Sequence, residues 1–184
     1  SGGGALICRS AEEANNVMWY ATQARDAYPY YEHTAIGYNY RMSNICAGIG
    51  RGQMQVLDSH VRARRANNLF YKGIFKKEQG ISVFSESSTD FFSNHWLTAI
   101  QIDTDKTTVS IEEMKQAFDA ENIECRHLWK PMHLQPVFET APFYGGKVAE
   151  NLFKNGLCLP SGSNMTDEDR ERIACVIIKV LAKN

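Results

Sequence analysis

Apolar residues recur at helical spacing through the middle of the chain. From Ser43 to about Lys77 no proline interrupts a series of apolar positions, most of which lie four or seven to eight residues from another: Ile45, Ile49, Val56, Leu57, Val61, Leu69 and Ile74. Residues at this spacing share one face of a helix, so the pattern predicts a single long helix with Ser43 as its N-cap. Gly48, Gly50 and Gly52 each disfavour a helix by about 1 kcal/mol relative to alanine, and they predict that another backbone or a ligand approaches this helix closely.

Three capping boxes predict where other helices begin. In each box a serine or threonine is followed three residues later by an acidic residue. The pairs are Ser10 with Glu13, Ser110 with Glu113, and Thr166 with Asp169. The first of these helices should run to about Arg25, and the second past Phe118. The third should contain the broad apolar face formed by the last fifteen residues.

Short apolar runs predict strands at residues 5–8, 95–103, 123–129 and 157–160. The run at 5–8 should be a buried strand whose sheet neighbours come from outside this sequence. A helix from 146 to 155, ended by Gly156, completes a strand and helix alternation in the second half, which is typical of an α/β or α+β domain. A polar, serine-rich stretch places a domain boundary between about Lys77 and Asn94.

Composition excludes several classes of protein. The 184 residues carry a formal net charge of -1, which leaves no overall basic surface for nucleic acid or an anionic membrane. The five cysteines include no CxxC pair, which favours reduced thiols over a disulfide framework or a zinc ribbon. No apolar run approaches the ~18 residues of a membrane span, so the sequence predicts a cytoplasmic protein without one.

Three segments concentrate residues that could carry chemistry. Residues 37–41 combine tyrosines with Asn39 and Arg41, which suits an anionic or sugar-bearing ligand, although a satisfied surface turn has the same composition. His127 and His133 could ligate a metal, but no HExxH helix or acidic third ligand accompanies them, and packing or a planar ligand is favoured. Residues 159–164 contain two serines outside a GxSxG elbow, which favours a turn.

These segments also carry a resemblance to a known family. Residues 37–50, GYNYRMSNICAGIG, resemble the signature of the pyridoxal-phosphate-dependent sugar aminotransferases called the DegT/DnrJ/EryC1/StrS family. The similarity continues through WKPMHLQPVF at 129–138, GLCLPSG at 156–162 and the last helix, so it covers essentially the whole chain. It is greatest to members that act on UDP-linked 4-keto sugars.

The resemblance implies a fold and an assembly. The chain would be the C-terminal half of a fold-type I, α/β transferase, with residues 1–80 forming the end of the large cofactor domain and its long helix. Residues 81–184 would form the small α/β domain. Members of the family form homodimers whose active sites combine both subunits.

The resemblance also implies roles for individual residues. Asn39 would reach the phosphate of the pyridoxal 5'-phosphate bound by the neighbouring subunit. Arg41 and Tyr38 would contact the nucleotide-sugar substrate, and His127, Trp129 and His133 would lie toward its nucleotide end. An uncharged amide donor and a guanidinium both suit phosphate oxygens.

The catalytic residue of the family is absent from this sequence. The resemblance places the family's Schiff-base lysine upstream of Ser1, just before the glycines matched here by residues 2–4, and no lysine precedes Lys72. The parent enzyme is predicted to transfer an amino group, from L-glutamate, to a UDP-4-keto-6-deoxy sugar, while this chain alone is a fragment without catalytic residues, inactive and metal-free. The alternatives are a non-catalytic nucleotide-sugar-binding or dimerisation module and a lysine-free, dehydratase-like relative.

Overall fold

The computed structural model of the chain describes residues 3–183 and contains two compact units. One ends at Leu57 and the other begins at Asp58, so the boundary falls inside helix α2 (Asn44–Ile74). The assignment of residues 1–80 to a cofactor domain and 81–184 to a small domain stays a prediction. Each unit is described by itself.

The first unit is built around helix α1 (Ala11–Ala21), which begins at the predicted cap. The Ser10 hydroxyl accepts a hydrogen bond from the Glu13 backbone N–H at 3.1 Å. Beyond the helix the chain turns through Gln23 and Ala24, both with positive φ. Gly37 packs against this turn so closely that a Cβ there would lie 2.5 Å from the Ala24 nitrogen, which explains the glycine.

The predicted strand at residues 5–8 is wrong for this chain. Leu6 and Ile7 are 70% and 94% exposed, and residues 5–8 have no strand partner within residues 3–183. A short apolar segment forms a buried strand only when neighbouring strands satisfy its backbone, and the described residues offer none.

Helix α2 confirms the predicted long helix. Its first turn is capped by Ser43, whose hydroxyl accepts from the Cys46 N–H at 3.2 Å, and a short 3₁₀ segment, η1 (Phe75–Lys77), follows it. The expected close approach to its glycines is absent among the described residues. A Cβ added at Gly48, Gly50 or Gly52 would meet no atom within 4 Å.

Replacing Gly48 and Gly52 together with alanine should therefore stabilise the isolated chain, because alanine favours a helix by about 1 kcal/mol per position. Urea unfolding followed by circular dichroism would measure the change. Gly73→Ala, in the same helix and with equally open space around its Cβ, is the matched control. If the double variant loses stability while the control gains it, another body packs on these glycines in solution.

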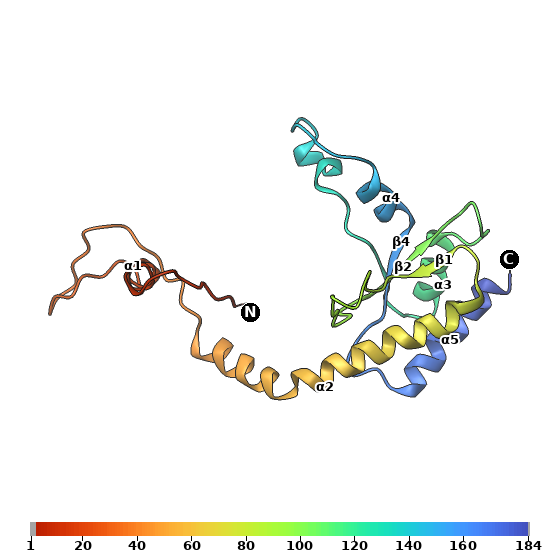
Figure 1. Cartoon of the computed structure of the whole chain (residues 1–184), viewed down its shortest axis with the longest axis horizontal. Helices are drawn as coiled ribbons and strands as arrows, with labels where there is room; N and C mark the ends of the chain where they lie inside the picture. The colour runs from red at the N-terminus through yellow and green to blue at the C-terminus, as the bar shows by residue number, and fades with distance from the viewer. Residues whose placement is uncertain (1–2, 184) are drawn as a thin grey trace. The chain divides into compact units, whose positions relative to one another are not determined.

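The second unit is a four-stranded sheet with helices packed on it (Figure 1). The strand order is β1-β2-β4-β3, and all three neighbouring pairs are antiparallel. The strands are β1 (Ile81–Val83), β2 (Thr98–Ile102), β3 (Arg126–His127) and β4 (Gly156–Leu159). The helices are α3 (Ile111–Ala120), η2 (Met132–Leu134), η3 (Pro136–Phe138), α4 (Val148–Asn155) and α5 (Asp167–Leu181).

The predicted elements of this unit are largely confirmed, with shorter strands. The capping boxes at Ser110 and Thr166 are both complete. β2 and β3 cover only part of the predicted runs at 95–103 and 123–129, and β1 was not predicted because three residues are too short for a recognisable pattern. β4 is buried along its whole length because it lies between two other strands.

The core lies between the sheet, α3, α5 and the end of α2. Ile100 of β2, Phe118 of α3 and Ile177 of α5 are fully buried there, with Tyr71 of α2 beside them. Arg170 of α5 also donates to the Asn67 side-chain oxygen of α2, at 3.0 and 3.2 Å, so the two helices are joined directly. None of the helices within residues 3–183 is long and apolar enough to cross a membrane.

Candidate functional site

The loop at residues 37–41 presents hydrogen-bond donors on a fixed backbone. The N–H groups of Tyr38 and Tyr40 donate to the carbonyls of Tyr20 and Ala21 at the end of α1, at 3.2 and 3.0 Å. The two tyrosine rings are 61% and 77% exposed and lie 5.7 Å apart. The loop is thus held by its main chain, while its side chains face outward.

Asn39 and Arg41 keep their donors available. The Arg41 backbone N–H donates to the Asn39 side-chain oxygen at 3.3 Å, so the amide NH₂ of Asn39 is left for a ligand. The Arg41 guanidinium is exposed and has no ion pair in the part of the chain that the structure describes. An uncharged donor beside a permanent cation suits a phosphate group.

The second unit contains a cleft that holds two of the other predicted residues. His127 and Trp129 both line this cleft, which has a volume of about 660 Å³. Arg64 of α2 and Trp96, which precedes β2, form another part of its wall. Sequence reasoning missed Trp96 because it was interpreted as part of the strand predicted at 95–103.

Burial keeps the thiols of this cleft protonated. Cys125 and Cys158 line it and are 4% and 6% exposed. Burial raises the pKa of the Cys125 thiol to about 11 and also raises the pKa of Cys158. Neither thiol is therefore a nucleophile at neutral pH.

His133 lies outside the cleft. Its Nε2 is 3.0 Å from a Glu150 carboxylate oxygen, and its ring stacks on Phe143 with centroids 3.8 Å apart. These contacts hold the segment from η2 to α4 together. Within residues 3–183 no three histidine, cysteine or acidic side chains gather as a metal site requires.

The turn at 160–162 serves the fold. The Ser161 hydroxyl is buried, accepts from the Thr98 N–H and donates to the Leu159 carbonyl, both at 2.8 Å. Three consecutive carbonyls of the turn accept hydrogen bonds from side chains of α2. Tyr71 bonds Pro160 at 2.7 Å, Arg64 bonds Ser161 at 3.1 Å, and Asn67 bonds Gly162 at 2.8 Å.

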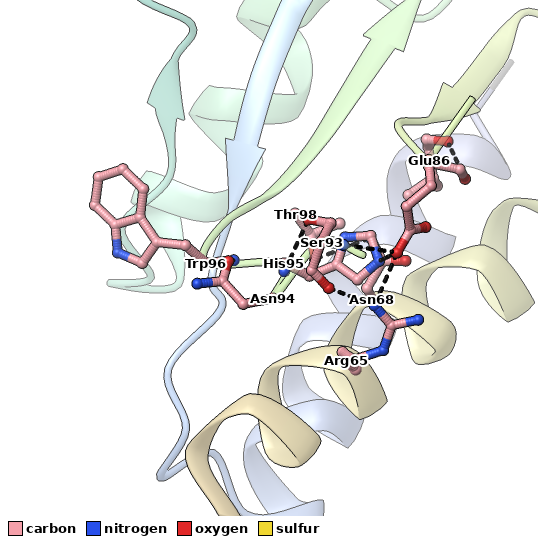
Figure 2. Close-up of polar contacts among 10 residues, drawn as sticks. Arg65, Asn68, Glu86, Ser93, Asn94, His95, Trp96 and Thr98 are labelled. Carbon is pink, nitrogen blue, oxygen red and sulfur yellow. Dashed lines mark hydrogen bonds and ion pairs between the residues drawn. The ribbon is translucent and has the colours of Figure 1, made fainter. Parts of the chain in front are cut away.

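A partly buried ionic network fixes the stretch before β2 (Figure 2). One carboxylate oxygen of Glu86 accepts from Arg65 at 2.8 Å and from the Ser93 N–H at 3.2 Å, and it lies 3.4 Å from His95 Nε2. Arg65 also donates to the Ser93 carbonyl and lies over the Phe92 ring. Sequence reasoning took residues 85–94 as a polar separator and did not find this network.

The network should be visible in the pH dependence of stability. The hydrogen bond from Arg65 holds the pKa of Glu86 at about 2, below its ordinary value of 4.5. A carboxylate with a depressed pKa stabilises the fold above its unfolded pKa and loses that contribution as the pH falls through its folded pKa. Glu86→Gln should be less stable than the parent at pH 7, and the difference should shrink between about pH 4.5 and pH 2.

Urea midpoints across this pH range would measure the effect. Glu112→Gln, at an exposed position of α3, controls for the loss of one negative charge. A difference between Glu86→Gln and the parent that stays constant down to pH 2 would show that Arg65 does not hold this carboxylate ionised.

An α/β unit of this topology, preceded by a donor-bearing loop and a long helix, is the architecture of a fold-type I transferase's second half. The model of the DegT/DnrJ/EryC1/StrS aminotransferase family matches residues 1–177, and the chain belongs to this family. Its fold is that of PLP-dependent sugar aminotransferases. Helicobacter pylori PseC, an aminotransferase involved in the biosynthesis of pseudoaminic acid, superposes with a TM-score of 0.80 at 19% identity, over 95% of this chain and 47% of PseC.

Curated relatives agree with the family. EpsN of Bacillus subtilis (strain 168), to which a pyridoxal phosphate-dependent aminotransferase activity is attributed, is 41% identical over 182 residues, covering 97% of this chain and 46% of EpsN. GDP-perosamine synthase of Escherichia coli O157:H7 is 28% identical over 166 residues, covering 90% of this chain and 44% of that enzyme. The chain therefore spans about half the length of the curated relatives it matches.

The cofactor of this family is pyridoxal 5'-phosphate, and the loop at 37–41 fits one end of it. The free NH₂ of Asn39 can donate to a phosphate oxygen without adding charge. The aldehyde end requires an amine, and the sequence has no lysine before Lys72. The first unit thus offers groups for the phosphate of the cofactor, but no lysine for its aldehyde.

The place expected for the Schiff-base lysine, upstream of Ser1, stays a prediction. Ser1 itself lies outside residues 3–183, which are the residues that the structure describes. The roles expected for Asn39 and Arg41 also stay predictions, and the geometry of their loop is compatible with them.

Proposed function

We propose that this chain forms the C-terminal half of a cytoplasmic, homodimeric aminotransferase. The enzyme would move an amino group from L-glutamate to the keto group of a UDP-linked sugar. The observation that carries the proposal is the exposed Asn39 and Arg41 pair, which leaves an amide NH₂ and a guanidinium free on a loop whose backbone is fixed. Family membership supports the reaction class.

Each residue of the loop has a separate role in this proposal. The Asn39 NH₂ donates to the phosphate of a cofactor held by the neighbouring subunit. Arg41 pairs with the diphosphate of the substrate, and Tyr38 offers its hydroxyl and ring face to the sugar nucleotide. When bound, pyridoxal phosphate supplies an electron sink for the reaction.

The nucleotide end of the substrate would lie at the cleft of the second unit. His127 and Trp129 contact it there, in agreement with their position on the cleft wall. His133 then has an indirect role, because its contacts with Glu150 and Phe143 position the segment that follows Trp129.

Asn39→Ala in the full-length enzyme should weaken the binding of pyridoxal phosphate by about tenfold or more, because a hydrogen bond to a charged group is lost. Titration of the apoenzyme, followed by cofactor absorbance, measures this affinity. Tyr40→Phe, next to Asn39 in the same loop, is the matched control and should leave the affinity unchanged. Equal affinity in Asn39→Ala and the parent would contradict the role assigned to Asn39.

A non-catalytic nucleotide-sugar-binding or dimerisation module is the second candidate. The two candidates differ in one measurement on the full-length protein. Amino transfer from L-glutamate to a UDP-4-keto sugar supports the enzyme. If the full-length protein binds the nucleotide sugar but transfers no amino group, the non-catalytic module is supported instead.

A further inference from the structure

Two exposed indoles lie next to each other in the lining of the cleft of the second unit. Trp96 and Trp129 are 59% and 67% exposed, and their ring centroids lie 6.2 Å apart at an interplanar angle of 36°. Both line the same 660 Å³ cleft, a volume within the usual range of small-molecule sites. Large aromatic rings left exposed in a cleft are suited to stacking on a flat ligand.

The backbone of Trp96 is held in place at one wall of this cleft. Arg64 donates to its carbonyl oxygen and, at 3.1 Å, to the carbonyl of Ser161. The Trp96 N–H donates to the Asn94 side-chain oxygen at 3.0 Å, next to the Glu86 network (Figure 2). Holding the backbone limits the positions that the ring can take, which reduces the freedom lost when a ligand stacks on it.

His95 sets the direction in which Trp96 leaves the backbone. Its φ is +46°, a left-handed conformation that few non-glycine residues adopt. The backbone N–H of His95 donates to the Ser93 hydroxyl at 3.0 Å, and its buried ring lies against Glu86. The ionic network therefore holds the bend from which Trp96 reaches the cleft.

The charged groups of the cleft favour an anion beside the flat ring. Arg64 uses only Nη1 for the two carbonyls, so its Nε and Nη2 are available within the described residues. Arg126 lies at the rim, 75% exposed, and its salt bridge to Glu124 is exposed as well and therefore weak. Guanidinium groups next to aromatic walls combine stacking with phosphate recognition.

We propose that this cleft binds the base of a nucleotide by stacking it on Trp96, with Trp129 moving outward to admit the base and the nucleotide's phosphate directed to Arg64 and Arg126. Because the ring centroids are only 6.2 Å apart, the base lies on Trp96, whose backbone is held, and the more exposed Trp129 adjusts. This inference rests on the proposed function and adds Trp96 as the residue that recognises the base.

Nuclear magnetic resonance of the ¹⁵N-labelled 184-residue chain can test the cleft directly. The chain has three tryptophans, so its indole N–H signals can be assigned from single Trp→Phe variants. UMP should shift the signals of Trp96 and Trp129 and leave that of Trp19, in the first unit, unchanged. Ribose 5-phosphate and inorganic phosphate, which lack the base, should shift neither cleft signal appreciably.

Trp96→Leu should weaken UMP binding at least about fivefold, because base stacking on an aromatic side chain is lost. Trp96→Phe should restore part of the affinity, and Trp19→Phe should bind as the parent does. Amide signals unchanged elsewhere in Trp96→Leu would show that this variant is folded. If the variant is not folded, the UMP affinities of Trp96→Phe and Trp19→Phe are compared instead, and a loss in Trp96→Phe alone supports the inference.

Either of two results would overturn the inference. One is the absence of any shift of Trp96 at millimolar UMP, and the other is an equal shift with ribose 5-phosphate, which would make the cleft an anion site alone. The proposed function fails separately, through the absence of amino transfer in the full-length protein. If UMP binds at Trp96 but the full-length protein transfers no amino group, the nucleotide-binding cleft stands and the proposed aminotransferase function is wrong.

Discussion

Replacing Gly156 with alanine should lower the free energy of unfolding of the second unit by about 3 kcal/mol or more, the upper range for an overpacked core. A Cβ at this position would lie 2.2 Å from Leu128 Cδ1 and 2.4 Å from the carbonyl oxygen of Leu152. The leucine side chain can move, but the carbonyl belongs to the backbone of α4. The clash therefore has to be relieved by shifting the helix away from β4.

Urea denaturation of the parent and the variant would measure this loss. Gly146→Ala, just before α4, has nothing within 4 Å of the added Cβ and should be close to neutral. The sequence predicted Gly156 as a helix stop, but its φ of −116° is open to any residue, so the requirement is one of space. A Gly156→Ala variant as stable as Gly146→Ala would contradict this packing.

Asn67→Leu should cost about 3 kcal/mol more than the same change at the adjacent Asn68. Asn67 is fully buried, donates to the Gly162 carbonyl at 2.8 Å and accepts two bonds from Arg170. Leucine would remove one of the two donors to that carbonyl, which also accepts from the Met165 N–H at 3.3 Å, and would leave part of the guanidinium without a partner. A buried group left unsatisfied costs ~1–3 kcal/mol, more when it is charged.

Asn68 provides a control of the same residue type, helix and burial. It is 1% exposed, its NH₂ makes one long bond of 3.5 Å to the Thr98 hydroxyl, and its side-chain oxygen has no partner within the described residues. Replacing a poorly satisfied polar group with an apolar one of similar shape is close to neutral or stabilising. Both variants gain the same helix propensity, so their difference in urea stability reports the hydrogen bonds. Equal losses at the two positions would contradict the assignment.

The features that could be predicted from the sequence are those determined locally. A capping box is closed within four residues, so Ser110 and Thr166 mark helix starts whatever the rest of the chain does. The long helix follows from its own periodicity. The strand at 5–8 could not be judged in this way, because a strand depends on partners that can lie anywhere in the sequence.

The candidate site was predictable only as separate segments. The backbone of residues 37–41 is held by residues at the end of α1, and their composition suited an anionic or sugar-bearing ligand but also an ordinary surface turn. Trp96 joins Trp129 through a contact between residues far apart in the sequence, and the Arg65 and Glu86 pair forms the same way. No local sequence pattern predicts such pairs, so Trp96 was not predicted as part of the cleft.

The three bonds from α2 to the turn at 160–162 also bear on how the protein is made. They join residues 89 to 97 positions apart, and the strand that precedes the turn pairs with strands on both sides. During synthesis on the ribosome the second unit cannot complete its sheet until nearly all of it has been made. Its earlier helices and β2 therefore remain without β4, the strand that pairs with β2 and β3. Such long-range closure is slow, and we expect nascent chains that stall before residue 156 to be targets for chaperones and proteases.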